Sequence, residues 1–108
     1  MESSPTKYGV VLVTVASIEA GKAIAQSLLE AKLAACVNLF PISSMYLWQG
    51  EINHDQEYQL LIKTDLGKLN QLTKQIKNLH SYEVPEIIAL PIIAGSDSYL
   101  KWLRECLK

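Results

Sequence analysis

The sequence contains few of the residues from which catalytic and redox sites are built. Its 108 residues include one arginine, two histidines and two cysteines, Cys36 and Cys106. Two cysteines do not form a disulfide framework, so we expect a reducing compartment. Neither a CxxC pair nor an HExxH motif is present, which excludes a structural zinc knot and a zincin protease on spacing.

Glycine-rich phosphate loops are absent as well. Neither GxGxxG nor GxxxxGKS/T occurs, so we do not expect a site for nucleotide hydrolysis. A serine nucleophile would need a positioned base, and no residue in the sequence is a candidate for one. We therefore predict that the protein is not an enzyme and carries no organic cofactor.

Charged residues are also scarce. They make up 19% of the chain, and the formal net charge of −1 provides no field that attracts nucleic acid or an anionic membrane. No apolar run approaches the ~20 residues needed to span a bilayer, and the first five residues do not resemble a signal peptide. We predict no nucleic-acid partner, no membrane association and a cytoplasmic location.

Apolar residues are abundant for so short a chain. They account for 49% of the sequence, and the mean hydropathy is +0.12. This is more apolar surface than one small domain covers by itself. An obligate oligomer explains the surplus, because the interfaces of such oligomers resemble a domain core cut in half.

The pattern of apolar residues predicts a single α+β domain over 8–108, after a disordered tail at 1–7. β-branched and alternating stretches predict four strands: Tyr8–Val15, Ala34–Phe40 (bent at Pro41 and resumed at Met45–Trp48), Tyr58–Thr64 and Glu86–Ile93. Three helices are predicted: two are capped by Ser17 and Asp65, and the last begins at Asp97.

The predicted order is β-α-β-β-α-β followed by one C-terminal helix. This is the split βαβ, or ferredoxin-like, arrangement, in which helices cover one face of an antiparallel sheet. The second and third strands are longer than this fold needs, which suggests a hairpin arm that reaches a neighbour. The other face of the sheet lacks a helical cover, so we expect a partner subunit to supply it.

The most informative stretch for function is His80–Ile88. It places an imidazole, a phenol and two carboxylates on a short connection before a strand. Charged groups are almost never fully buried unless they are paired, so this cluster is not core filling. Pro85 holds the residues before the strand in an extended conformation.

Four segments that follow one another in a characteristic order point to a family. They are Leu33–Asn38 (LAACVN), Tyr46–Glu51 (YLWQGE), Leu61–Thr64 (LIKT) and Tyr82–Ile87 (YEVPEI). Together they resemble the CutA divalent-cation tolerance family, over about Val10 to Leu107. The resemblance implies a ferredoxin-like homotrimer, similar in architecture to the PII nitrogen-signalling proteins. It also implies a cytoplasmic protein linked to copper and other divalent cations.

The resemblance further implies a metal site that includes His80. A neutral imidazole binds copper or zinc well, although a histidine at a helix C-terminus is also favoured by the helix dipole alone. Some relatives add a cysteine in the first strand and a second histidine beside this one. Those positions are Val13 and Leu79 here, which removes two donors.

Glu83 and Cys36 are the other predicted metal ligands. Glu83, like Glu86, suits a hard or borderline cation, but both carboxylates are equally suited to ion pairs with Lys63 or Arg104. Cys36 either binds a soft cation as a thiolate or is an inert, buried thiol.

A cleft between subunits is predicted to be lined by Trp48, Glu57, Lys63, Tyr82 and Glu86. The resemblance places Trp48 and Tyr82 near this cleft, although such aromatic residues often only pack at an interface. Lys63 is either a solvated strand residue or a lysine that attracts an anion into the cleft.

Two functions follow from these residues. The first is a trimeric divalent-cation binding and tolerance protein, whose clefts bind copper(II) or a related cation through His80 and nearby carboxylates. The alternative is a PII-like signalling protein. In that case the same clefts bind a small anionic metabolite, and the arm contacts a protein partner.

Overall fold

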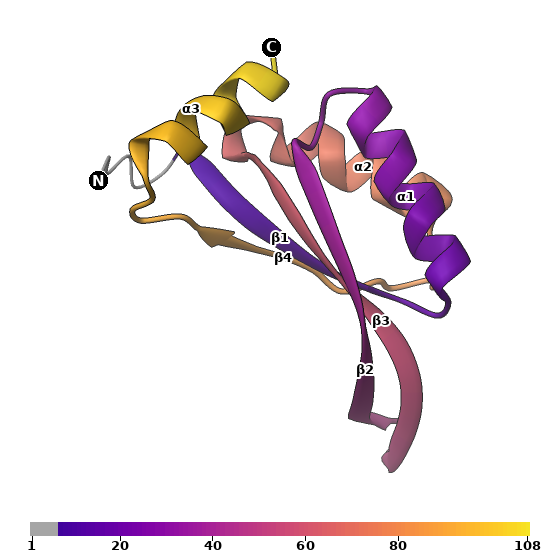
Figure 1. Ribbon diagram of the computed structural model, residues 1–108. Coiled ribbons are helices and arrows are strands. Elements are labelled where there is room, and N and C mark those ends of the chain that lie inside the picture. The colour runs from indigo at the N-terminus through magenta and orange to yellow at the C-terminus, as the bar shows by residue number, and fades with distance from the viewer. Residues whose placement is uncertain (1–6) are drawn as a thin grey trace.

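The computed structural model describes residues 7–108 as an α+β fold, and residues 1–6 of the predicted tail lie outside the described residues (Figure 1). The elements are β1 (Tyr8–Val15), α1 (Ile18–Glu30), β2 (Cys36–Trp48), β3 (Glu51–Asp65), the 3₁₀ turn η1 (Leu66–Lys68), α2 (Leu69–Leu79), β4 (Ile87–Pro91) and α3 (Asp97–Cys106). Lys7, which was assigned to the tail, accepts a hydrogen bond from the Leu66 N–H through its carbonyl oxygen.

The four strands form one antiparallel sheet in the order β2-β3-β1-β4. The central pair is β1 and β3, with Tyr8 opposite Asp65 and Val15 opposite Tyr58. This order and the alternation of strands and helices confirm the ferredoxin-like prediction. Within the described residues, no helix is both long and apolar enough to cross a membrane.

The helices α1 and α2 cover one face of the sheet, where the main core lies. Every second residue of β1 and β3 points into this core, as the two-residue period of a strand requires. The core residues are Val11, Val13, Val15, Ile24, Leu28, Leu33, Ala34, Leu60, Ile62, Leu72 and Ile76. Burial of each large aliphatic side chain contributes roughly 1.5–3 kcal/mol.

The third helix does not join the other two. Leu100, Leu103 and Leu107 pack on Tyr8, whose side chain points to the opposite face from Val11 and Val13. Helix α3 therefore covers one end of the second face, on the other side of the sheet from α1 and α2 (Figure 1). It begins at Asp97, as predicted, and its N-terminus is capped by Ser96, which accepts from the Tyr99 N–H.

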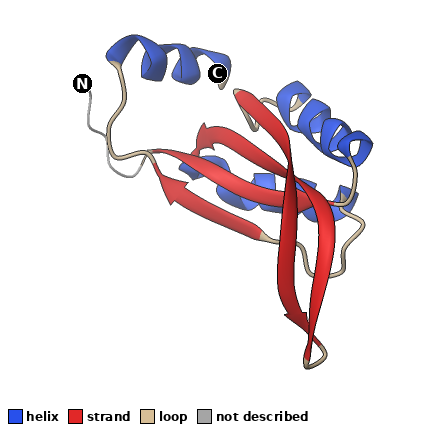
Figure 2. Cartoon of the chain, turned by 60° about the horizontal axis from the view of Figure 1, so that its bottom comes forward, coloured by secondary structure: helices blue, strands red, loops and turns tan. Residues whose placement is uncertain are grey.

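The strands β2 and β3 continue beyond the core as an arm, which we define as residues 42–57. Figure 2 shows both strands extending past the rest of the sheet, and this confirms the predicted hairpin. Gln49 and Gly50 join them with φ values of 53° and 79°. Two positive φ values match a type I′ turn, whose twist suits a two-residue hairpin.

Three predictions about the strands need correction. Strand β2 is not interrupted at Pro41, which pairs with Tyr58 within a continuous ladder. An edge strand tolerates proline because the missing N–H faces away from its neighbour. The polar stretch 53–56 predicts a loop that includes His54, but this residue lies in β3 opposite Met45. The fourth strand is shorter than predicted and ends at Pro91.

Two predictions about the helices also need correction. Asp65 caps the turn η1, by accepting from the Gly67 N–H, and α2 begins only afterwards. The spacing of Leu79 from Leu72 and Ile76 predicts that it shares their apolar face, but its side chain is exposed. Leu79 is the last residue of α2, directly before the chain turns into the loop at His80.

Substituting Gly9 with alanine is expected to lower the free energy of unfolding by about 1–3 kcal/mol. Gly9 lies in β1 between two strands, and an added Cβ would lie 2.7 Å from the Leu90 carbonyl oxygen and overlap the Leu66 side chain. Urea denaturation measures the change. Gly67→Ala is the control, because its Cβ would meet only the Asp65 side chain. Equal midpoints for the two variants would contradict the prediction.

Candidate functional site

His80 is anchored at the end of α2 through both ring nitrogens. Nε2 lies 2.7 Å from the Thr14 carbonyl oxygen, and Nδ1 lies 3.0 Å from the Tyr82 backbone nitrogen. A carbonyl oxygen only accepts and a backbone N–H only donates, so Nε2 carries the hydrogen and Nδ1 the lone pair. His80 is therefore a neutral imidazole whose Nδ1 faces the loop at 81–86.

The local sequence explains this placement. Helix α2 ends because His80 adopts an extended backbone conformation, with φ of −79° and ψ of 140°. The chain then forms no regular structure until Ile87, since Pro85 cannot continue a helix. The ring of Tyr82 packs on the His80 ring at 4.7 Å between centroids, which holds the loop against the end of β1.

Tyr82 connects this loop to a buried carboxylate on β3. Its hydroxyl donates to Glu57 Oε2 at 2.7 Å, and Glu57 is only 8% exposed. Burial and then the hydrogen bond to Glu57 raise the pKa of the Tyr82 phenol well above its usual range. The proton therefore stays on Tyr82 at neutral pH, and Glu57 keeps its acceptor role.

A second phenol–carboxylate pair lies next to the first. Tyr46 on β2 donates to Asp55 Oδ2, and this hydrogen bond is the largest cause of the raised pKa of Tyr46. Asp55 and Glu57 are two residues apart on β3 and share one face of the arm. The sequence interpretation missed Tyr46 and Asp55, because residues 53–56 were assigned to a loop. The i, i+2 spacing of the two carboxylates was the available signal.

Glu83 and Glu86 are exposed on the loop and its border with β4. Among the described residues, neither carboxylate forms an ion pair with Lys63 or Arg104, the two partners considered from the sequence. Lys63 instead donates to the Asn38 side chain. Both carboxylates are therefore available to a ligand, and Glu83 lies three residues from His80.

Cys36 lies far from His80 within one protomer. It pairs with Lys63 on β3, which in turn pairs with Val10 on β1. His80 docks on Thr14, four residues further along β1, or about 13 Å at the rise of a strand. The structure does not bring Cys36 and His80 into one site. In the described part of the chain, no group of three or more His, Cys, Asp or Glu side chains is arranged to hold a metal ion.

The predicted cleft residues are also spread along the sheet. Trp48 pairs with Glu51 at the tip of the arm, six residues along β3 from Glu57, or about 20 Å. Lys63 lies six residues from Glu57 in the other direction. Glu57 and Tyr82 touch, but Trp48, Lys63 and Tyr82 do not form an anion-binding cleft within one protomer.

Replacing Tyr82 with phenylalanine is expected to remove the last phenol to ionise in an alkaline titration followed at 295 nm. The folded-state pKa of Tyr82 is raised above its ordinary value of 10.0. Its contribution to stability is thus complete below about pH 10 and is lost as the pH rises through the folded-state pKa. Tyr58→Phe is the control and should keep this last step. Persistence of the step in Tyr82→Phe would contradict the assignment.

Comparison with known proteins places this arrangement in a family. Residues 9–106 match the family described as CutA1 divalent ion tolerance protein. The chain belongs to the CutA1 family. It is 53% identical over 97 residues to the divalent-cation tolerance protein CutA of Thermus thermophilus, covering 89% of this chain and 94% of that protein. As a member of this family of tolerance proteins, the chain is not an enzyme.

Solved CutA structures share the whole fold. The CutA of Archaeoglobus fulgidus, described as a periplasmic divalent cation tolerance protein, superposes with a TM-score of 0.92 at 39% identity, covering 94% of this chain and 99% of that chain. The CutA1 of Thermus thermophilus gives a TM-score of 0.90 at 50% identity, with the same coverage.

The location of CutA proteins varies with the organism. The chloroplastic CutA of Arabidopsis thaliana is 50% identical over 105 residues, covering 95% of this chain and 58% of that protein. One relative is thus described as chloroplastic and another as periplasmic. A cytoplasmic location of this CutA protein stays a prediction.

Proposed function

We propose that this CutA protein is a cytoplasmic homotrimer that binds copper(II) or a related divalent cation at sites between protomers. The observation that carries the proposal is the orientation of His80. Its Nε2–H donates to the Thr14 carbonyl oxygen, which leaves the lone pair of Nδ1 directed at the acidic loop.

This is the arrangement that metal-ligating histidines usually have. A histidine that binds a metal through one nitrogen almost always donates its other N–H to a carbonyl or carboxylate, which sets the tautomer and the ring orientation. In the metal-free protein, the Tyr82 N–H occupies Nδ1. A cation would replace this single hydrogen bond and leave the anchor to Thr14 in place.

The remaining donors would be oxygen atoms. Glu83 is exposed and lies on the same loop, and carboxylates together with imidazole suit copper(II) and other borderline cations. The described residues of one protomer do not supply three such donors in one place. A second protomer therefore completes the site in this proposal. Cys36 lies far from His80 in the same chain, so it would contribute a thiolate only from that second protomer.

The exposed apolar surface supports the homotrimer. Phe40, Ile88 and Leu90 lie on the sheet face that α3 leaves open, and large apolar side chains project from the arm. Large apolar side chains gathered on one exposed face are typical of protein–protein interaction surfaces. The two cysteines are free, which is compatible with a cytoplasmic location.

A copper(II) titration of the metal-free protein by calorimetry, run with light scattering on the same sample, tests the proposal. We expect a mass of three times the 12.0 kDa of the chain. We also expect saturable binding of one cation per protomer with a Kd below ~1 μM, or about −8 kcal/mol. A monomer that releases no heat with copper(II) would refute the proposed function.

A further inference from the structure

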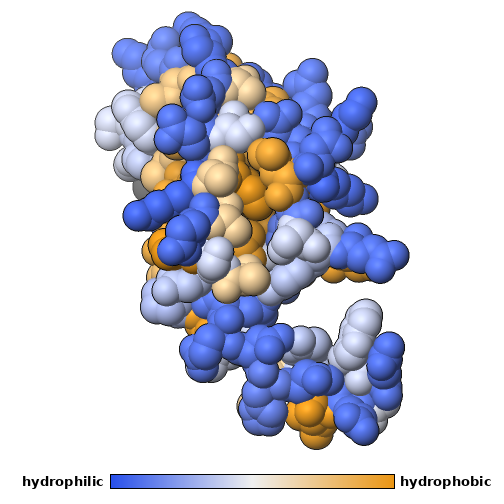
Figure 3. Space-filling view, turned by 90° about the vertical axis from the view of Figure 1, so that its right-hand side faces the viewer, coloured by the Kyte–Doolittle hydropathy of each residue, from blue (hydrophilic) through white to orange (hydrophobic). Residues whose placement is uncertain are grey.

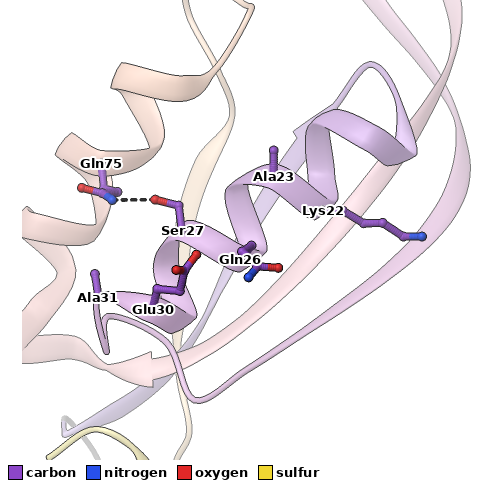
Figure 4. A pocket seen from close by; sticks show the side chains of 7 residues that line it. All are labelled: Lys22, Ala23, Gln26, Ser27, Glu30, Ala31 and Gln75. Atoms are coloured by element: carbon purple, nitrogen blue, oxygen red, sulfur yellow. Dashed lines mark hydrogen bonds between the residues drawn. The ribbon is translucent and has the colours of Figure 1, made fainter.

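A groove of mixed polar and apolar lining runs between α1 and α2, on the side of the molecule away from the open sheet face. It consists of two adjoining depressions of 760 Å³ and 440 Å³ that share Ala31 and Gln75. Figure 4 shows Gln75 of α2 and Ser27 of α1 pointing toward each other across it, joined by a hydrogen bond of 2.6 Å. The cation site proposed above uses no residue of this groove.

The walls of the groove carry carboxamides from both helices. Gln26 comes from α1, and Gln71, Gln75 and Asn78 come from α2. A carboxamide has two donors and an acceptor with two lone pairs, so it pairs with a peptide group in both senses. The small side chain of Ala31 leaves room between the walls. In Figure 3, which faces this side of the molecule, hydrophilic side chains lie on both sides of a hydrophobic strip.

The charge of this helical layer differs in sign from that of the whole protein. Residues 18–32 and 66–79 contain five lysines and two glutamates, a net charge of +3, whereas the whole chain has −1. Helix α2 contains no acidic residue. Among residues 7–108, Lys22, Lys74 and Lys77 form no ion pair. Lys22 and Lys74 line the groove together with one carboxylate, Glu30, so its lining keeps a net positive charge.

We propose that the α1–α2 groove binds an extended, acidic peptide segment of a partner protein. Lys22 on α1 and Lys74 on α2 would attract its carboxylates, and the carboxamides would hydrogen-bond its backbone. A nucleic acid fits less well, because the groove has neither an arginine nor an aromatic side chain on which a base could stack. A trimer assembled through the open sheet face and the arm leaves this groove exposed.

The test uses the full-length assembled protein and a fluorescein-labelled dodecapeptide of alternating glutamate and alanine. Fluorescence anisotropy should show saturable binding that weakens with added salt. The double variant Lys22→Gln/Lys74→Gln should bind about tenfold more weakly, since exposed charge pairs each change affinity by a few-fold. The matched control is Lys101→Gln/Arg104→Gln on α3, which removes the same charge and should bind within about twofold of the original protein.

A third variant separates the groove from charge alone. Gln75→Leu keeps the charge but removes the carboxamide, and we expect it to weaken binding severalfold. Backbone amide shifts caused by the peptide should map to α1 and α2. The proposal is overturned if the peptide does not bind, if both double variants lose the same affinity for it, or if Gln75→Leu binds it as the original protein does. It is also overturned if the amide shifts are confined to the arm, or if a thymidine oligonucleotide binds more tightly than the peptide.

Discussion

Replacing His80 with alanine is expected to weaken copper(II) binding by about 100-fold or more. Removing a residue that only orients a metal ligand typically costs 10–100-fold in affinity, and loss of the ligand itself should cost at least the upper end of that range. His80 is the only imidazole near the acidic loop, because the other histidine, His54, lies on the arm opposite Met45. Calorimetric titration of the metal-free variants measures the effect.

His54→Ala is the matched control, and we expect it to bind copper(II) as the unmodified protein does. His80→Asn separates binding from folding. An asparagine oxygen at this position can still accept from the Tyr82 N–H, as the imidazole Nδ1 does. The loop should then keep its conformation while the imidazole donor is lost. If His80→Ala and His54→Ala gave the same isotherm as the unmodified protein, the cation would bind elsewhere.

His80→Ala and His80→Asn should both lower the free energy of unfolding, and the alanine variant should lose more. The alanine substitution removes hydrogen bonds to Thr14 and Tyr82, each of which contributes about 0.5–1.5 kcal/mol. His80→Asn keeps the second of them and should lose roughly half as much. A melting experiment without metal distinguishes this structural role from the ligand role.

Replacing both Leu47 and Ile52 with serine is expected to convert the proposed trimer into monomers of 12.0 kDa. The two residues face each other across the arm and are 76% and 65% exposed in a single chain. If a neighbour covers the arm, each side chain contributes about 1.5–3 kcal/mol of burial. Three copies of the arm lose both contributions at once. Light scattering or sedimentation at micromolar concentration measures the mass.

Leu29→Ser serves as the control for this change. Leu29 is an exposed leucine of α1, on the helical layer and away from the arm. Its substitution should leave the mass unchanged. A trimer that survives the loss of both arm residues would show that the open sheet face alone holds it together. The arm variant should also lose copper(II) binding, because the proposed site needs donors from two protomers.

The strand and helix order followed from local patterns that tertiary contacts did not override. Tyr8–Val15 is β-branched and apolar, and it forms β1 with the predicted bounds. Ser17 caps α1 through the Ala20 N–H as predicted, because a short hydroxyl side chain satisfies a free N–H of the first turn. The alternation of apolar and polar residues that predicts strands was weakest in the arm, where residues 53–56 are polar on both faces. Polar residues there predict a loop, yet their backbone pairs with β2.

The residues of the candidate site were predicted from the sequence, but their contact partners were not. The His80–Glu83 stretch was visible in the sequence, since an imidazole and carboxylates on a short proline-bordered connection are not core residues. The partners of these residues were not visible. Glu57 is 25 residues from Tyr82 and Thr14 is 66 residues from His80, and both contacts arise only when the strands align.

The sequence by itself determined the family, the order of the strands and helices, and which residues bring an imidazole and carboxylates to the candidate site. These depend on local propensity and on motifs read along the chain. Only the tertiary structure decided the tautomer of His80, the burial of Glu57, the separation of Cys36 from His80 and the placement of α3 on the second face. The physical reason is that strand register sets which distant side chains meet. Register depends on the packing of the whole sheet, and no short stretch of sequence encodes it.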